Sequence, residues 1–294
     1  MEIASDDKLP LIIDTDANNE LDDQHALAYL FFNQDLFDIV GVTVNTTSSG
    51  GNIDKQVAEA VRVMKLCDVY ESIPMLPGAD DSFSKIAPNL EESAYDGHEA
   101  VEFIIRESQK KRESKLILLP IGKLTNIALA LKKAPEIAQN IRIIWLGSNY
   151  PEPGEHNLVN DIPAMNFILD MEVPFEMVMV RYGEPSGSDA VRVTPERIEQ
   201  EMKGLGPSVD PIVGRHGGID LHGDPPSRAL FDVVPVALLK NKNWGEFKEI
   251  PAPTMEDEEW IKRPDNPRMV GIWENFNSPA ILNDFFETMR SPSR

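Results

Sequence analysis

Short apolar runs alternate with helical patterns along the whole chain, and this alternation constrains the fold more than any other feature. The apolar runs predict strands at 9–13, 37–44, 115–119, 141–146, 175–180 and 269–273, and the helical patterns lie at 21–32, 53–64, 124–131, 226–239 (interrupted by Pro235) and 279–289. Strands that alternate with helices build βαβ units with parallel strands. The sequence therefore predicts an α/β fold with an open, mainly parallel (Rossmann-like) sheet flanked by helices. We expect one domain over residues 1–294, because such folds often exceed ~200 residues.

The charge balance narrows the choice of partners. The chain has 49 acidic and 28 basic side chains, so its formal net charge is −21. Because nucleic-acid and anionic membrane surfaces are bound mainly through Lys and Arg, we expect neither partner. No apolar run approaches the ~18 residues of a membrane helix. A single cysteine, Cys67, forms no internal disulfide, and the compartment stays open: cytoplasm, or periplasm if residue 1 is a trimmed mature end.

The most informative segment follows the first predicted strand, where Asp14, Asp16, Glu20, Asp22 and Asp23 fall within ten residues. Ligands of open α/β sheets bind at the carboxyl ends of strands, which is where these carboxylates lie. Carboxylates packed this closely raise one another's pKa unless a cation lies among them or they face water. Oxygen ligands suit calcium or magnesium rather than zinc.

Two motif classes can be compared with this acidic segment. An EF-hand fails, because counting from Asp14 its sixth and twelfth positions hold Asn19 and His25 rather than Gly and Glu. A phosphohydrolase of the haloacid-dehalogenase type also begins with a strand and Asp-x-Asp, with the first Asp as nucleophile. It usually has Thr or Val where this chain has Asn18, and it stays an alternative.

Several further motifs follow the acidic segment along the chain. In order, the segments are Asp14-Thr-Asp16 followed by Asp22-Asp23, Gly41-Val-Thr-Val with Gly51-Asn52, Ile73-Pro-Met-Leu-Pro-Gly78-Ala, Leu118-Leu-Pro-Ile-Gly122-Lys-Leu-Thr125-Asn126, Trp145-Leu146-Gly147, Asn166-Phe-Ile-Leu-Asp170 and Asp232-Val-Val-Pro-Val-Ala. In these segments and in their order, the chain resembles the nucleoside hydrolases, the inosine-uridine preferring N-ribohydrolase family.

The resemblance implies a calcium ion and a set of site residues. The implied metal ligands are Asp16, Asp23, Asp232 and the backbone carbonyl of Thr125, with Asp14 behind them. Asp22 would take the proton of a water that attacks C1 of a ribosyl group. The implied substrate contacts are Asn52, Leu146, Asn157, Asn166 and Phe231.

The sequence also departs from the family pattern. Five residues separate Asp16 from Asp22, so that Asn19 or Glu20 is expected to reach the site, and Asn45 competes with Asn52 for the sugar. Ala164 stands where the family usually has a Glu. One contact to a sugar hydroxyl is therefore expected to be missing, unless Asp161 or Glu155 provides it. A family His, proposed as acid to the leaving base, is replaced by Phe231; its ring can stack on a flat group, and His216 and His222 are alternative acids.

The resulting functional hypothesis is calcium-dependent hydrolysis of an N-glycosidic bond in a ribonucleoside or related riboside. The alternatives are the phosphohydrolase and a non-catalytic, calcium-dependent sugar-binding protein. The expected partners are a small nucleoside or sugar and further copies of the chain, as a homodimer or homotetramer.

Overall fold

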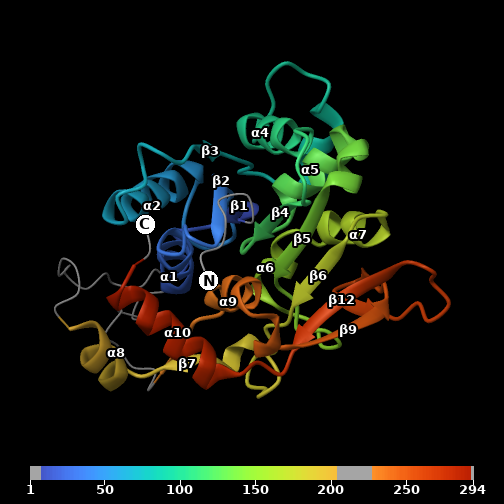
Figure 1. The fold of residues 1–294 in the computed structure, drawn as a ribbon. Helices are drawn as coiled ribbons and strands as arrows, with labels where there is room; N and C mark the ends of the chain where they lie inside the picture. The colour runs from blue at the N-terminus through green and yellow to red at the C-terminus, as the bar shows by residue number, and fades with distance from the viewer. Residues whose placement is uncertain (1–7, 204–226, 293–294) are drawn as a thin grey trace.

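The computed structural model describes residues 8–203 and 227–292, and a central sheet organises them (Figure 1). Its strands are β1 (Leu9–Thr15), β2 (Phe37–Val44), β3 (Met75–Pro77), β4 (Leu116–Pro120), β5 (Ile141–Leu146), β6 (Phe175–Val178), β9 (Glu246–Pro251) and β12 (Met269–Glu274). The strand order is β3-β2-β1-β4-β5-β6-β12-β9. All neighbouring pairs are parallel except β12 and β9. The predicted fold class, an open and mainly parallel sheet, is confirmed.

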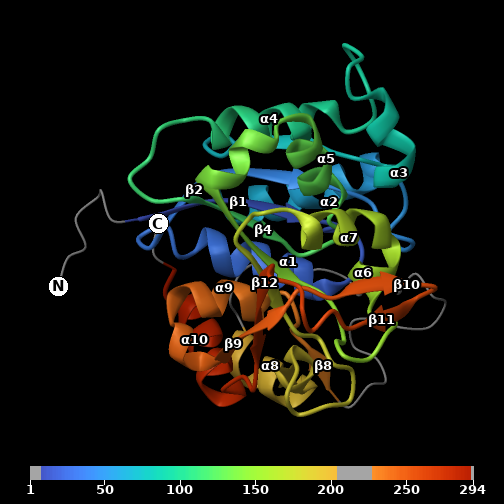
Figure 2. The ribbon, with the colours of Figure 1, turned by 90° about the vertical axis from the view of Figure 1, so that its right-hand side faces the viewer.

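Helices cover both faces of this sheet (Figures 1 and 2). One layer contains α1 (Leu21–Phe31), α2 (Ile53–Leu66), α9 (Val233–Lys240) and α10 (Ser278–Arg290), and the other α4 (His98–Ser108), α5 (Thr125–Lys133) and α7 (Ile162–Asp170). Successive strand residues point to opposite faces, so Leu11 and Ile13 join the first apolar layer and Ile12 the second. Burial of both faces explains why the strands are continuous apolar runs.

The remaining elements are short. They are the helices α3 (Phe83–Ile86), α6 (His156–Asn160) and α8 (Pro195–Met202), the 3-10 turns Ala87–Asn89, Pro135–Asn140, Ser188–Ala190 and Lys242–Trp244, and the two-stranded pairs β7 (Arg192–Val193) with β8 (Arg228–Ala229) and β10 (Thr254–Glu256) with β11 (Glu259–Ile261). Among the described residues, no helix is long and apolar enough to cross a bilayer.

The predicted helix at 226–239 is wrong in its first half. Residue 226 lies outside the described residues, β8 occupies the next positions, and α9 begins only at Val233. Pro235 does not interrupt this helix, because it lies in the first turn, where a backbone N–H has no intrahelical partner. Strand β9 was not predicted, since it is a largely exposed edge strand rich in charged residues and without an apolar run.

The chain order of the strands creates a switch point beside β1. From β1 the chain builds β2 and β3 on one side, and it later returns to build β4, β5 and β6 on the other side. At the carboxyl end of β1, Asp14 lies opposite Thr43 of β2 and Pro120 of β4. Ligands of open α/β sheets bind at such a crevice, so the fold directs attention to the loops that leave these strands.

Candidate active site

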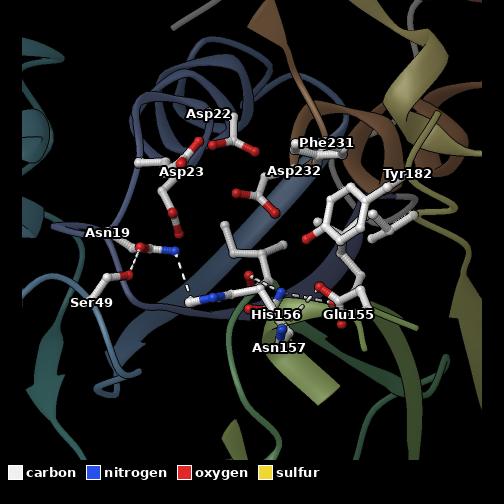
Figure 3. Close-up of a pocket in the computed structure, with 14 residues that line it drawn as sticks. Asn19, Asp22, Asp23, Ser49, Glu155, His156, Asn157, Tyr182, Phe231 and Asp232 are labelled. Atoms are coloured by element: carbon white, nitrogen blue, oxygen red, sulfur yellow. Dashed lines mark hydrogen bonds between the residues drawn. The ribbon is translucent and has the colours of Figure 1, made fainter. Parts of the chain in front are cut away.

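A pocket lies at the carboxyl ends of the strands, beside the switch point (Figure 3). Its walls come from the β1–α1 turn, the loops after β2, β4, β5 and β6, helix α6, and the segment that enters α9. The lining residues are Asn19, Glu20, Asp22, Asp23, Ser49, Ile121, Leu146, Glu155, His156, Asn157, Val180, Tyr182, Phe231 and Asp232.

Three buried carboxylates meet in this pocket, and we call them the carboxylate trio: Asp22, Asp23 and Asp232. One oxygen of each lies within 4.8 Å of the others. Asp22 and Asp23 lie in the first turn of α1, and Asp232 is the N-cap residue of α9, although its carboxylate does not cap that helix. Two helix N-termini therefore point at the trio, and their partial positive charge favours anions there.

The electrostatics of the trio are unfavourable without a counter-charge. Burial, reinforced by the neighbouring carboxylates, raises the pKa of Asp22 to about 7 and raises the pKa values of Asp23 and Asp232 well above the usual range. No Lys or Arg lines the pocket among the residues that the structure describes. Buried carboxylates of this kind bind either a proton or a cation.

The donor chemistry fits a hard cation. The trio offers only carboxylate oxygens, the ligands that calcium and magnesium prefer. Asp16 lies behind the trio and is fully buried. Its Oδ2 accepts a 2.5 Å hydrogen bond from Thr47 Oγ1, whereas its Oδ1 has no hydrogen-bond partner in the described part of the chain. A buried oxygen without a donor is what a cation site requires.

Asp14 has a different environment, although it belongs to the same sequence motif. Its carboxylate accepts hydrogen bonds from Thr43 Oγ1 (2.6 Å), Asn45 Nδ2 (2.7 Å) and Asn126 Nδ2 (2.7 Å). Burial raises the pKa of Asp14 to about 6, and the three donors oppose that rise. Asp14 does not line the pocket. It therefore supports the site from behind, and it is in no position to act as the nucleophile of a phosphohydrolase.

The enlarged β1–α1 turn reaches the pocket, as its length predicts. Asn19 and Glu20 both line the pocket. The turn is held by Asn18, whose backbone N–H donates to Gln56 Oε1 (2.6 Å) and whose Nδ2 donates to the Gly50 carbonyl (2.7 Å). The five-residue turn is thus fixed to the loop that leads into α2.

A comparison with protein families matches residues 11–249 to the inosine-uridine preferring nucleoside hydrolases. The chain belongs to this family. The match extends from β1 through β9 and includes every residue that lines the pocket.

Individual relatives are distant. The chain is 28% identical over 190 residues to the pyrimidine-specific ribonucleoside hydrolase RihA of Shewanella oneidensis, covering 57% of the chain and 58% of that protein. It is 29% identical over 181 residues to the non-specific ribonucleoside hydrolase RihC of Klebsiella pneumoniae, covering 53% and 56%. The chain thus spans a little over half the length of these curated relatives.

Solved structures share the fold over nearly the full length. A plant nucleoside hydrolase, PpNRh1, superposes with a TM-score of 0.74 at 15% identity, covering 97% of this chain and 99% of that one. A purine-preferring ribonucleoside hydrolase from Gardnerella vaginalis superposes with a TM-score of 0.71 at 20% identity, covering 95% and 98%. Because these sequence identities are low, the superpositions establish a shared fold and nothing about the substrate.

In this member of the family, the predicted carbonyl ligand, that of Thr125, is not supported by its position. Thr125 begins α5, does not line the pocket, and donates its hydroxyl to Asp161 (2.5 Å). Ile121, four residues earlier, lines the pocket directly after β4. Its carbonyl accepts from Asn157 Nδ2 (2.9 Å), and a second lone pair stays available. The structure therefore offers the Ile121 carbonyl in place of that of Thr125.

The predicted sugar-binding asparagines separate into two groups. Asn157 lines the pocket, and its amide donates to the carbonyls of Ile121 and Leu146, which leaves the side-chain carbonyl for a ligand. Asn166 is not in the pocket, because its amide pairs with Thr254 and Met255 of β10. Asn52 is exposed at the N-terminus of α2 and does not line the pocket either.

The residues considered as substitutes for the missing family Glu have structural roles. Glu155 lines the pocket, but its carboxylate accepts from the backbone N–H groups of Ser148, Asn157 and Leu158 and thereby caps α6. Asp161 accepts from the N–H groups of Phe83 and Ala164 and from the Thr125 hydroxyl. Ala164 itself is fully buried in α7. Asp161 does not line the pocket, whereas Glu155 does, so Glu155 stays the alternative for the missing family Glu.

Five residues that line the pocket were missed by sequence reasoning, namely Ser49, Ile121, His156, Val180 and Tyr182. His156 begins α6, and its Nε2 lies 3.2 Å from Asn19 Nδ2 and 4.0 Å from Asp16 Oδ2. Tyr182 follows β6 and packs edge-on against Phe231, with ring centroids 5.8 Å apart. The only sequence signal for Tyr182 was its position just after the predicted strand at 175–180, and His156 had no such signal. Leu146 and Phe231 line the pocket as expected, whereas His216 and His222 lie outside the described residues.

Proposed function

We propose that the protein hydrolyses the N-glycosidic bond of a ribonucleoside or related riboside with the help of calcium. The observation that carries this proposal is the buried carboxylate trio at the floor of a pocket in a member of the nucleoside hydrolase family. The named relatives are ribonucleoside hydrolases, which supports the same class of substrate. A neutral nucleoside suits a chain whose net charge of −21 repels phosphate-bearing polymers.

Calcium would be held by Asp23, Asp232 and Asp16, together with the Ile121 carbonyl. All four donors are oxygens, and Asp16 Oδ1 has no other partner in the described part of the chain. When bound there, calcium would supply positive charge that favours deprotonation of water, and it would help to orient sugar hydroxyls.

Asp22 is the proposed proton acceptor. It lines the pocket, and it is the member of the trio that is not assigned to calcium, so its carboxylate is left to accept a proton from a water in the pocket. The water oxygen attacks C1 of the sugar while the bond from C1 to the base nitrogen breaks, and Asp22 takes one proton of the water. The surrounding carboxylates favour the positive charge that develops on the sugar ring. Asp16 is the alternative acceptor, since one of its oxygens has no donor.

The other walls would bind the two ends of the substrate. The side-chain carbonyl of Asn157, the amide of Asn19 and the ring of His156, which all line the pocket, would contact sugar hydroxyls. Phe231 and Val180 contribute apolar surface to the lining, which suits a flat base.

Two measurements test the proposal. Calorimetric titration of metal-free protein should show calcium binding below millimolar concentration, and a nucleoside panel should release reducing sugar in a reaction that EDTA abolishes. Calcium and ribose binding without turnover would identify a sugar-binding protein instead, and release of inorganic phosphate from phosphomonoesters would favour the phosphohydrolase. The homodimer or homotetramer is still a prediction, which sedimentation would test.

A further inference from the structure

We propose that Tyr182 contacts the leaving base and donates a hydrogen bond to it as the glycosidic bond breaks. The inference rests on the proposed function and deepens it. It assigns to a residue of the β6 loop the contact that Phe231, with no proton to donate, is unable to make.

Tyr182 belongs to the wall of the pocket where a base would lie. Its ring stands at 88° to that of Phe231, and both rings line the pocket. Figure 3 shows its hydroxyl turned toward the pocket interior, on the side of Asp232. His156 and Asn19 lie together on the other side, where they contact each other. Among the described residues, Tyr182 is therefore the hydroxyl donor on the aromatic side.

The chain holds Tyr182 through a strained backbone position. The preceding residue, Arg181, has φ of 46°, a left-handed conformation that residues other than glycine seldom adopt. The Arg181 side chain is fixed by an ion pair with Glu274 (2.6 Å) and by a hydrogen bond from Nε to the Tyr150 carbonyl (3.1 Å). The Tyr182 backbone N–H donates to Asn149 Oδ1 (3.3 Å). Strain that several contacts maintain is typical of functional sites.

The chemistry gives this hydroxyl a defined task. When the C1–N bond breaks, its electron pair moves to the base, so negative charge develops in the ring that faces Tyr182. Burial, together with the carboxylates of Glu155, Asp22 and Glu20, raises the pKa of Tyr182, and a hydrogen bond from the His156 backbone opposes the rise. The hydroxyl therefore stays protonated at neutral pH and keeps its proton to donate. Tyr182 thus stabilises the departing base by a hydrogen bond and keeps its proton. The base then takes a proton from solvent, and Asp22 releases to solvent the proton that it took from water.

The test compares two leaving groups in wild type and Tyr182→Phe. Inosine and uridine have poor leaving groups that need a donor, whereas 4-nitrophenyl riboside releases a stable anion that does not. We expect Y182F to lower kcat on the better nucleoside about 10- to 100-fold, the range for a lost hydrogen bond to a charged group. Its kcat on the nitrophenyl riboside should stay within about threefold of wild type. Tyr70→Phe, at an exposed tyrosine outside the pocket, is the matched control and should change neither rate.

The outcomes separate this inference from the proposed function. An equal loss on both substrates would show that Tyr182 acts only through structure, and no loss on the nucleoside would show that it does not contact the base; either result overturns the inference alone. A wild-type protein that cleaves neither substrate overturns the proposed function and the inference with it.

Discussion

Asp14 and the carboxylate trio are all buried, yet their surroundings differ. Asp14, Asp22 and Asp23 belong to the acidic segment at and after the end of β1, and Asp232 lies at the N-terminus of α9. Asp14 is surrounded by three side-chain donors from β2, the loop after it and α5. The carboxylates of Asp22, Asp23 and Asp232 lie close to one another, and the Thr15 hydroxyl donates a hydrogen bond to Asp23 (2.6 Å). The first arrangement is complete with protein groups alone, whereas the second calls for a cation or protons.

This difference assigns roles within one motif. A carboxylate that already accepts several hydrogen bonds contributes to stability and does not need to exchange partners. Carboxylates that have few donors and repel one another gain most from a ligand, and their charge is available to the reaction. Substitutions in the two groups should therefore have opposite signatures in activity and stability.

The largest effect is expected for Asp22→Asn. Because an amide is unable to accept the proton of the attacking water, kcat on the best nucleoside should fall on the order of 1,000-fold, within the range for loss of a general base. Steady-state assays of released sugar would measure this loss. Asp16→Asn is the matched comparison: if it abolishes turnover while retaining calcium and Asp22→Asn does not, Asp16 is the proton acceptor.

Asp232→Asn should weaken calcium binding at least about 100-fold. Substitution of residues that only support the ligands of a metal already lowers the metal affinity about 10- to 100-fold, and loss of a ligand should lower it at least as much. The same change should leave the metal-free protein at least as stable as wild type, because it removes one of three mutually repelling charges. Calorimetric titration and thermal unfolding would report the two effects. Asp257→Asn, at an exposed acid, is the control; unchanged calcium affinity in Asp232→Asn would contradict the ligand assignment.

Asp14→Ala should show the reverse signature. It leaves buried donors on Thr43, Asn45 and Asn126 without their acceptor, so the free energy of unfolding should fall by roughly 3 kcal/mol. The fall should be the same with and without calcium, as measured by urea unfolding. Asp38→Ala, at an exposed position on β2, should have little effect. A loss that appears only in the presence of calcium would mean that Asp14 belongs to the metal site.

The smallest expected effect is a pH dependence of the metal-free protein. The folded-state pKa of Asp22 is raised to about 7, so its contribution to stability is full below about pH 4 and is lost as the pH rises through 7. The Tm without calcium should therefore be a few degrees lower at pH 8 than at pH 5.5, and saturating calcium should remove the difference. A metal-free Tm that rises over this interval would contradict the uncompensated trio.

Much of the fold could be predicted from the sequence, because strands that are buried on both faces have continuous apolar sequences. Strands β2 and β5 have the predicted bounds. The start of α9 could not be predicted, since Pro235 reads as a helix breaker unless the first turn is known. Strand β9 has no continuous apolar run that would predict a strand, and it forms by antiparallel pairing with β12.

The sequence by itself determined that acidic groups gather after β1 and that Asp232 belongs with them, because local spacing and a family pattern are readable along the chain. Only the tertiary structure decided which carboxylates have donors, that Ile121 rather than Thr125 reaches the pocket, and that Asn166 binds β10 instead of a ligand. It also brought His156 and Tyr182 into the site. The physical reason is that these roles depend on contacts between distant segments, such as Asp14 with Asn126 or Tyr182 with Phe231, and one-dimensional spacing does not encode such contacts.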